Sequence, residues 1–366
     1  MPLHKTSAWP LALICVGLIF YASLYPFTDW RDQGIMPWAF LSSPLPKYWT
    51  GFDVASNILG YMPLGFLLVL SALRSGRARY AVILAALAAG CLSLMMESLQ
   101  NYLPVRVPSN VDLALNTVGA LSGALLAWAM EKLGVIDRWS RFRGRWFVAD
   151  ARGGLVLLAL WPLALLFPAA VPFGLGQVLE RLEAALAEVL QDTPFLDWLP
   201  VRDIELQPLV PAAELVCVML GLLIPCLLGF CIIRALRRRV LFVMVVFAVG
   251  MGVTALSAAL SYGPEHAWAW FGLPVKIGLL AALGLAVLLL RVPMRASAAL
   301  VLLALGIYLS LLNQAPASPY FAQTLATWEQ GRFIRFHGLA QWLGWLWPYV
   351  VMVYVLLPLW QRGPKN

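Results

Sequence analysis

The side chains of this sequence that are best suited to chemistry lie in one short polar segment between two apolar stretches. Glu97 and Gln100 stand near the end of the first stretch, Arg106 lies in the turn, and Asp112 and Asn116 open the second. Where apolar stretches cross a membrane, ionisable side chains at the edge of the hydrocarbon region are costly unless they are paired or hydrated. We therefore interpret this segment as a candidate functional site.

An earlier apolar stretch opens with the same pattern. The two copies read Asp53-Val-Ala-Ser-Asn57-Ile-Leu-Gly60 and Asp112-Leu-Ala-Leu-Asn116-Thr-Val-Gly119. Residues at i, i+4 and i+7 share one helix face, so each copy predicts an aspartate, an asparagine and a glycine on a single face. Because the two stretches run in the same direction, the pattern favours a parallel pseudo-repeat about an axis normal to the membrane, of the kind found in transporters.

Together these residues would form a small polar pocket with three carboxylates and one guanidinium. Arg106 can pair with an acid or bind a phosphate group through two hydrogen bonds. Repulsion among Asp53, Glu97 and Asp112, the candidate catalytic residues, favours holding one carboxyl group protonated, which is the state that a general acid requires. The residues predicted to bind a ligand are Asp53, Asn57, Glu97, Gln100, Arg106, Asp112 and Asn116.

Each of these residues also has a purely structural interpretation. The two aspartates suit the first turn of a helix, where the helix dipole favours an acid. The two asparagines can form hydrogen bonds between helices, and Glu97 can form a structural ion pair with Arg106. Gly119 and Gly123, spaced four residues apart, are most simply interpreted as packing residues that let two helices approach closely.

The composition indicates an integral membrane protein. Hydrophobic residues make up 61% of the 366 residues and charged residues only 12%, whereas soluble domains carry about 25% charged residues. A helix that crosses a membrane needs about 20 mostly apolar residues, and ten stretches approach or reach that length. They are residues 9–25, 53–73, 80–100, 112–130, 154–173, 210–233, 240–262, 268–290, 296–312 and 339–360. The predicted fold is an all-α, polytopic bundle of about ten transmembrane helices.

The basic residues set the predicted orientation of these helices. Most of the 26 Lys and Arg residues fall in segments that are cytoplasmic if the N-terminus is inside, chiefly 74–79, 132–152, 234–239 and 291–295. Cytoplasmic loops are enriched in Lys and Arg, so both termini are predicted to lie inside. The excess of basic over acidic residues therefore reflects the orientation of the helices in the membrane and does not indicate nucleic-acid binding.

The chain is predicted to divide into two unequal membrane domains. Residues 9–130 would form a four-helix domain and residues 154–366 a six-helix domain, joined by a basic cytoplasmic linker at 131–153. The second domain includes an outer loop, 175–206, that holds several acids. Apolar residues recur in that loop with helical spacing, which predicts an amphipathic helix at the membrane surface.

Two further expectations concern the second domain. A second surface helix is predicted at about 320–330, before the last apolar stretch. Glu214 and Lys276 each lie near the outer end of a predicted transmembrane helix, and we expect them to form a structural ion pair.

No sequence motif identifies a particular reaction. The sequence contains no nucleotide-binding loop, no metal-ligand set of His and Cys and no nucleophile motif, so we expect no cofactor and no metal. The five cysteines fall within the apolar stretches, where they suit small packing residues. An enzyme would have to work with carboxylates and arginine alone.

The first domain resembles the VanZ-like family of bacterial membrane proteins over about residues 9–130. The residues that carry the resemblance are Ser23-Leu-Tyr-Pro26, Asp53-x-x-x-Asn57 with Pro63-x-Gly65, and Glu97-x-x-Gln100-x-x-x-Pro104-x-Arg106-x-x-Ser109-x-x-Asp112-x-x-x-Asn116-x-x-Gly119-x-x-x-Gly123. The founding member of the family lowers susceptibility to the lipoglycopeptide teicoplanin. Small members end near the fourth transmembrane helix, whereas this chain continues through residues 131–366.

The resemblance implies a multi-pass protein of the bacterial cytoplasmic (inner) membrane with a role in the cell envelope. The leading hypothesis is that the outward-facing pocket binds an envelope lipid or a lipid-linked glycan precursor and affects glycopeptide susceptibility. One alternative is a membrane-embedded enzyme with Glu97 as acid or base and Arg106 as anion clamp; a transporter and a scaffold are the others. Nucleic acid is not expected as a partner, and residues 154–366 are expected to offer a surface for other membrane proteins.

Overall fold

The computed structural model describes residues 8–25, 27–45, 51–76, 79–166, 169–195, 208–316 and 334–360. Within these ranges the chain is helical, and no β-strand is present. One isolated antiparallel bridge joins Phe147 and Ile233. The predicted all-α fold is confirmed.

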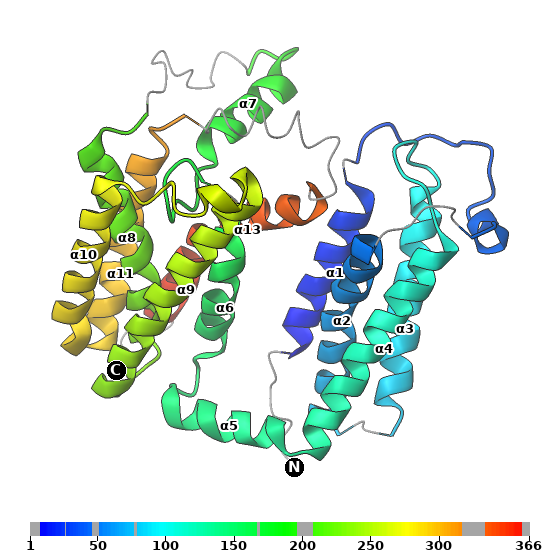
Figure 1. Cartoon of the computed structure of the whole chain (residues 1–366), viewed down its shortest axis with the longest axis horizontal. Coiled ribbons are helices and arrows are strands. Elements are labelled where there is room, and N and C mark those ends of the chain that lie inside the picture. Colours follow the sequence, from blue (N-terminus) through cyan, green and yellow to red (C-terminus); the bar gives the residue numbers. More distant parts are fainter. Residues whose placement is uncertain are drawn as a thin grey trace. The chain divides into compact units, whose positions relative to one another are not determined.

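Each of the ten predicted apolar stretches contains a helix (Figure 1). These helices are α1 (Ala8–Leu24), α2 (Gly51–Arg74), α3 (Ala81–Gln100), α4 (Asn110–Lys132), α6 (Arg152–Leu165), α8 (Pro211–Phe230), α9 (Leu236–Tyr262), α10 (Leu273–Leu288), α11 (Met294–Leu312) and α13 (Ile334–Trp360). Among the described residues, 7 helices are long and apolar enough to cross a membrane, while α1, α6 and the stretch Gln341–Leu357 are shorter apolar helices. The chain is a multi-pass membrane protein.

Two amphipathic helices and three short 3-10 helices complete the described elements. They are α5 (Val135–Trp146), α7 (Leu179–Leu190), η1 (Ala39–Ser42), η3 (Pro264–His266) and η4 (Leu289–Arg291). The surface helix expected from residue 175 onward begins only at Leu179. The helix expected at 320–330 lies outside the described residues.

The predicted apolar helix at 154–173 is shorter than expected. α6 ends at Leu165, and residues 169–178 form no helix. Pro172 lacks the N–H that a continuing helix requires, and proline also disfavours the helical conformation of the residue before it. Phe173 has a φ of 62°, in the left-handed region that non-glycine residues rarely occupy. The apolar composition of this stretch thus reflects burial of a loop and not a longer helix.

That loop is ordered by contacts from two later helices. Phe173 and Leu175 are buried. The Tyr308 hydroxyl of α11 donates to the Phe173 carbonyl over 2.6 Å and accepts the N–H of Leu175. The N–H of Gly176 donates to the Gly344 carbonyl of α13 over 2.8 Å. Non-helical backbone at membrane depth is tolerated where protein buries it or where it lines a cavity.

The chain forms two compact units, Met1–Phe142 and Arg143–Asn366, whose boundary falls inside α5. In unit 1, Arg74 of α2 donates to Ser140 Oγ of α5 over 2.9 Å. In unit 2, Arg238 of α9 donates to the Arg145 carbonyl at the other end of α5. The predicted linker 131–153 therefore contains a helix whose two halves are held by different units.

Helices α2 and α4 of unit 1 pack closely and in parallel. A Cβ added at Gly119 would lie 2.3 Å from the Ile58 carbonyl oxygen, and one at Gly123 would lie 1.9 Å from the Met62 carbonyl oxygen. Residue numbers rise together along both contacts, so the two helices run in the same direction. The interpretation of Gly119 and Gly123 as packing residues is confirmed.

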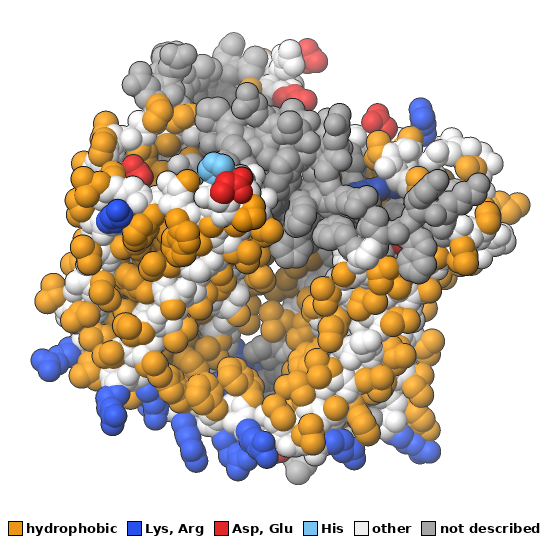
Figure 2. Space-filling view, viewed as in Figure 1, with side chains coloured by type: hydrophobic (Ala, Val, Ile, Leu, Met, Phe, Trp, Pro, Cys, Tyr) orange, Lys and Arg blue, Asp and Glu red, His pale blue; other side chains and the backbone are white. Residues whose placement is uncertain are grey.

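In unit 2, helix α8 is the most deeply buried, with every residue from 220 to 230 inside the bundle. It packs against α10 and α11. The helices around it expose apolar side chains outward, among them Leu280 and Leu288. In Figure 2 hydrophobic side chains cover the flanks of the helices in each unit, and Lys and Arg gather at one end of them. This is the surface expected of helices that face lipid.

Candidate functional site

Six polar side chains from three helices of unit 1 form one connected cluster at the end where α3 ends and α4 begins. Each helix contributes two residues four positions apart, which places both on the same face of that helix. They are Asn57 and Tyr61 of α2, Ser93 and Glu97 of α3, and Asp112 and Asn116 of α4. We call this group the polar cluster.

Two side-chain hydrogen bonds join helices within the polar cluster. Asn57 Nδ2 donates to Asp112 Oδ1 over 3.0 Å, linking α2 to α4. Asn116 Nδ2 donates to Ser93 Oγ over 2.9 Å, linking α4 to α3. Ser93 and Asn116 are buried. Such bonds hold helices together in a medium that offers the side chains no water.

Glu97 is the most unusual member of the cluster, because it is a carboxylate with only 3% of its surface exposed. Its Oε2 accepts the backbone N–H of Ser109 over 2.8 Å. Ser109 is the N-cap of α4, and its side chain in turn accepts the N–H groups of Val111 and Asp112. The Glu97 carboxylate therefore lies at the start of α4, where the helix dipole favours negative charge.

Two buried polar atoms of the cluster have no hydrogen-bond partner in the part of the chain that the structure describes. They are the Tyr61 hydroxyl and Asn116 Oδ1. The Ser93 side chain is nonetheless a near hydrogen-bonding neighbour of the Tyr61 hydroxyl, and the Glu97 carboxylate acts on that hydroxyl electrostatically. Most buried polar atoms in proteins are paired, so unpaired ones need an explanation such as a bound water or ligand.

Gln100 and Arg106 contact the end of α1. Gln100 Nε2 donates to the Ser23 carbonyl over 3.1 Å. Arg106 donates from Nε to the Tyr25 carbonyl over 3.1 Å and from Nη2 to the Ala22 carbonyl over 3.3 Å. The last carbonyls of a helix lack partners within it and carry partial negative charge, so this arginine caps α1.

Of the seven predicted ligand-binding residues, four therefore meet in the polar cluster and two contact α1. The seventh, Asp53, lies in the first turn of α2, one helical turn before Asn57. The sequence reasoning missed Tyr61 and Ser93. Their positions, four residues after Asn57 and four before Glu97, are the signal that could have identified them.

The two copies of the Asp-Asn-Gly pattern lie in different surroundings. Asn57 bonds to Asp112 of the other copy, whereas Asn116 bonds to Ser93 of α3. Gly119 packs against the backbone of α2, but a Cβ at Gly60 would meet nothing within 4 Å. The copies are thus parallel, yet the structural role of their glycines differs.

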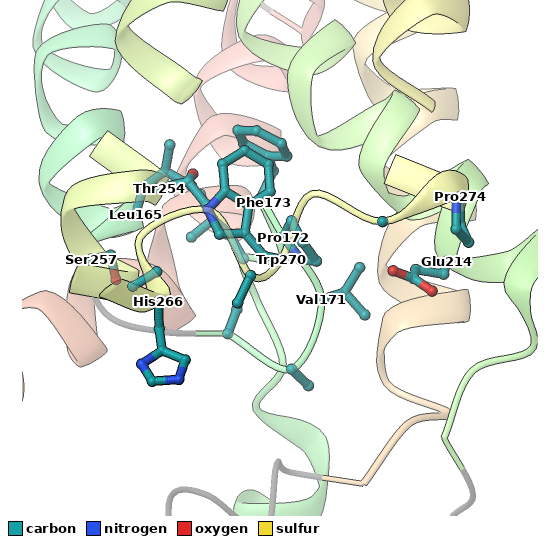
Figure 3. Close-up of a pocket in the computed structure, with 17 residues that line it drawn as sticks. Leu165, Val171, Pro172, Phe173, Glu214, Thr254, Ser257, His266, Trp270 and Pro274 are labelled. Carbon is teal, nitrogen blue, oxygen red and sulfur yellow. The ribbon is translucent and has the colours of Figure 1, made fainter. Parts of the chain in front are cut away.

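Unit 2 contains a cavity of about 540 Å³ that the sequence did not predict (Figure 3). The loop 169–178 forms one wall, and the ends of α8, α9 and α10 complete it; Phe173, Trp270, Glu214, Thr254, Ser257 and His266 are among its lining residues. Thr254 Oγ1 is buried and has no hydrogen-bond partner among the described residues. This volume lies in the range of small-molecule sites, which is roughly 300–1,000 Å³.

The expected ion pair between Glu214 and Lys276 is not formed. No salt bridge joins them within the described part of unit 2; Glu214 lines the cavity instead. The Lys276 ammonium lies 5.3 Å from the centre of the Phe271 ring. A cation–π contact of this kind can replace an ion pair for an ammonium near the end of a helix. Elsewhere in the described ranges, no group of three His, Cys, Asp or Glu side chains could hold a metal ion.

The polar cluster and the packing of unit 1 coincide with a known protein family. Residues 8–131 match the VanZ/LLP1 family. All seven predicted ligand-binding residues fall inside this VanZ-like region, as do Tyr61 and Ser93. The resemblance seen in the sequence is confirmed for that part of the chain. No curated protein and no solved structure matches the chain.

Proposed function

We propose that the VanZ-like region binds the polar head of an envelope lipid or of a lipid-linked glycan precursor at the polar cluster. The observation that carries the proposal is the buried Glu97 carboxylate in one cluster with Asn116 Oδ1, a buried acceptor that lacks a partner among the described residues. Ionisable groups inside a membrane bundle mark functional sites by default, because burying them is costly. A bundle held only by packing would not need them.

The chemistry of the polar cluster suits a ligand that donates hydrogen bonds. Glu97, Asp112 and the carboxamide oxygens are acceptors, and sugar hydroxyls or ammonium groups are donors that such a set recognises. The cluster lies at the end of α2, α3 and α4 that the distribution of Lys and Arg assigns to the outside of the cytoplasmic membrane. On this orientation both termini are cytoplasmic, and the ligand comes from the cell envelope.

An envelope role would include altered susceptibility to glycopeptides such as teicoplanin, which is the phenotype associated with the family's founding member. The test is to express wild type and Glu97→Gln in a bacterium that lacks the chain and to measure teicoplanin susceptibility at matched membrane protein levels. The carboxamide oxygen of the substituted side chain can still accept the Ser109 N–H, so this contact at the start of α4 is kept while the charge is lost. We expect Glu97→Gln to abolish the change in susceptibility that the wild type confers.

The matched control is Ser109→Ala, which removes the N-cap of α4 but leaves Glu97 in place. Loss of a cap costs about 1 kcal/mol, so this variant reports what mild destabilisation alone does. We expect Ser109→Ala to retain the phenotype. A Glu97→Gln protein that accumulates normally and behaves as wild type would reduce the polar cluster to structural hydrogen bonding.

Cysteine labelling tests the direction in which the cluster opens. With the native cysteines replaced by serine, Asp112→Cys should react with a membrane-impermeant thiol reagent added from outside, because the reactive thiolate forms in water. Leu125→Cys, exposed on the apolar flank of the same helix, should not react. Labelling of Asp112→Cys only after the cytoplasmic side is opened would reverse the proposed orientation.

A further inference from the structure

A second cavity lies in unit 2 where two hairpin turns meet. One turn, 231–235, joins α8 to α9, and the other, 289–293, joins α10 to α11. The cavity between them has a volume of about 300 Å³ and is lined by Arg234, Leu236, Arg239, Leu290, Arg291, Val292, Pro293 and Met294. Three arginines thus surround a space that no acid lines.

Arg239 forms the inner wall of this cavity and is only 5% exposed. Its guanidinium donates to the carbonyls of Leu290 and Val292 over 2.8 and 2.7 Å and to that of Phe230 over 2.9 Å. Phe230 is the last residue of α8, where the partial negative charge of the helix end favours a cation, and Leu290 and Val292 lie in the turn after α10. With the Nε bond to the Ile233 carbonyl over 2.8 Å, all three guanidinium nitrogens donate to backbone carbonyls, which supply no anion to neutralise the full charge of Arg239.

Arg234 and Arg291 stand at the mouth of the cavity. Both are exposed, and neither makes a hydrogen bond or ion pair with any described residue. Three like charges around one small space repel one another, so a bound anion would lower the energy of the site. Guanidinium groups bind phosphate oxygens through paired hydrogen bonds, which a simple point charge does not provide.

The remaining lining residues indicate where the phosphate comes from. Leu236, Val292 and Met294 are apolar and share the cavity with the arginines. A free phosphate ion has no apolar part to place against them, whereas a phospholipid has its glycerol and acyl chains next to the phosphate. Basic pockets between membrane helices on the cytoplasmic side are suited to anionic lipid headgroups.

We propose that this cavity binds the phosphate group of an anionic phospholipid. The site lies in the other unit from the polar cluster, and the proposal does not depend on the proposed function. Arginines in cytoplasmic turns are also a general topology signal, so the test must separate this cavity from the surrounding basic surface.

The chain offers a matched control for that purpose. Arg237 and Arg295 lie on the first turns of α9 and α11, are exposed, and do not line the cavity. The double variant Arg237→Gln/Arg295→Gln removes the same charge as Arg234→Gln/Arg291→Gln from positions three and four residues further along the chain. The full chain is placed in nanodiscs of phosphatidylcholine with phosphatidylglycerol, and the lipid retained after release is measured by native mass spectrometry.

We expect the wild type and Arg237→Gln/Arg295→Gln to retain phosphatidylglycerol in preference to phosphatidylcholine. In Arg234→Gln/Arg291→Gln the preference should fall roughly tenfold, the scale on which loss of charge-assisted hydrogen bonds changes affinity. Equal losses in the two double variants would mean that diffuse surface charge holds the lipid, and no loss in Arg234→Gln/Arg291→Gln would remove the cavity as the site. Either result overturns the proposal.

Two further arms complete the test. Inorganic phosphate added to the wild type should not displace phosphatidylglycerol. If phosphate displaces the lipid and also stabilises the protein, the occupant is a soluble phosphate and the lipid assignment is wrong. Should the glutamine variant fail to fold, Arg234→Lys/Arg291→Lys keeps the charge and loses the paired hydrogen bonds. Retention of full lipid preference in that lysine variant would also contradict the proposal.

Discussion

The two glycines of the repeated pattern make a sharp test of how unit 1 is packed. Gly60 and Gly119 occupy the same position in the two copies, and both lie inside helices. A Cβ at Gly119 would lie 2.3 Å from the Ile58 carbonyl oxygen and 2.8 Å from Ile58 Cα, whereas one at Gly60 would meet nothing within 4 Å. The same substitution to alanine should therefore destabilise the protein at Gly119 but not at Gly60.

The expected magnitudes follow from the two environments. Because the contact of Gly119 is with backbone, α2 and α4 must separate, and overpacking of this kind costs about 1–3 kcal/mol. At Gly60 alanine only improves helix propensity, a gain of up to about 1 kcal/mol. We expect Gly119→Ala to lower the free energy of unfolding and Gly60→Ala to leave it unchanged or raise it.

The purified chain is unfolded in detergent micelles with increasing mole fractions of dodecyl sulfate. Circular dichroism monitors the loss of helix at each step. Wild type, Gly60→Ala and Gly119→Ala are compared under one set of conditions, so the unfolded reference is shared. A shift of the same sign and size for both variants would show that α2 and α4 do not approach as closely as the structure has it. The parallel packing that positions the polar cluster would then be wrong.

Two other predictions address orientation and unit 2. A reporter fused after Arg238 should report cytoplasm and one within 191–195 should report the outside; the reverse would overturn the orientation argued from Lys and Arg. Tyr308→Phe removes the hydroxyl that bonds to Phe173 and Leu175, which should cost about 1–3 kcal/mol because buried polar groups lose their partner. Faster proteolysis within the loop 169–178 of purified Tyr308→Phe would confirm this role, whereas cleavage at the wild-type rate would contradict it.

The helices of this fold could be predicted from the sequence because burial in a membrane requires long apolar stretches. The α6 segment shows the limit of that reasoning, since hydrophobicity alone does not tell a buried loop from a helix. Residues 169–173 are as apolar as the helix before them, and the loop that they begin is held in its non-helical form by Tyr308 of α11 and Gly344 of α13. Proline at 172 was the local signal against a continued helix.

The candidate site was predictable in part for a related reason. Charged and carboxamide side chains stand out in an apolar sequence, so Glu97, Asp112 and Asn116 could be identified from their type. Tyr61 and Ser93 do not stand out, since both residue types are common in membrane helices. The contact of Arg106 with the end of α1 depends on how distant segments fold together, and no spacing along the chain predicts it.

The loop 169–178 ties the larger cavity of unit 2 to helices that come much later in the chain. Gly176 donates to Gly344 of α13, and its carbonyl accepts the side-chain N–H of Asn313 and the hydroxyl of Tyr349. Asn313 follows α11, and Tyr349 lies within α13. A change in the tilt of α13 against α11 would therefore move the loop and change the shape of the cavity, because the loop forms one of its walls. The positions of α11 and α13 thus help to set the shape of a cavity formed by the ends of α8, α9 and α10.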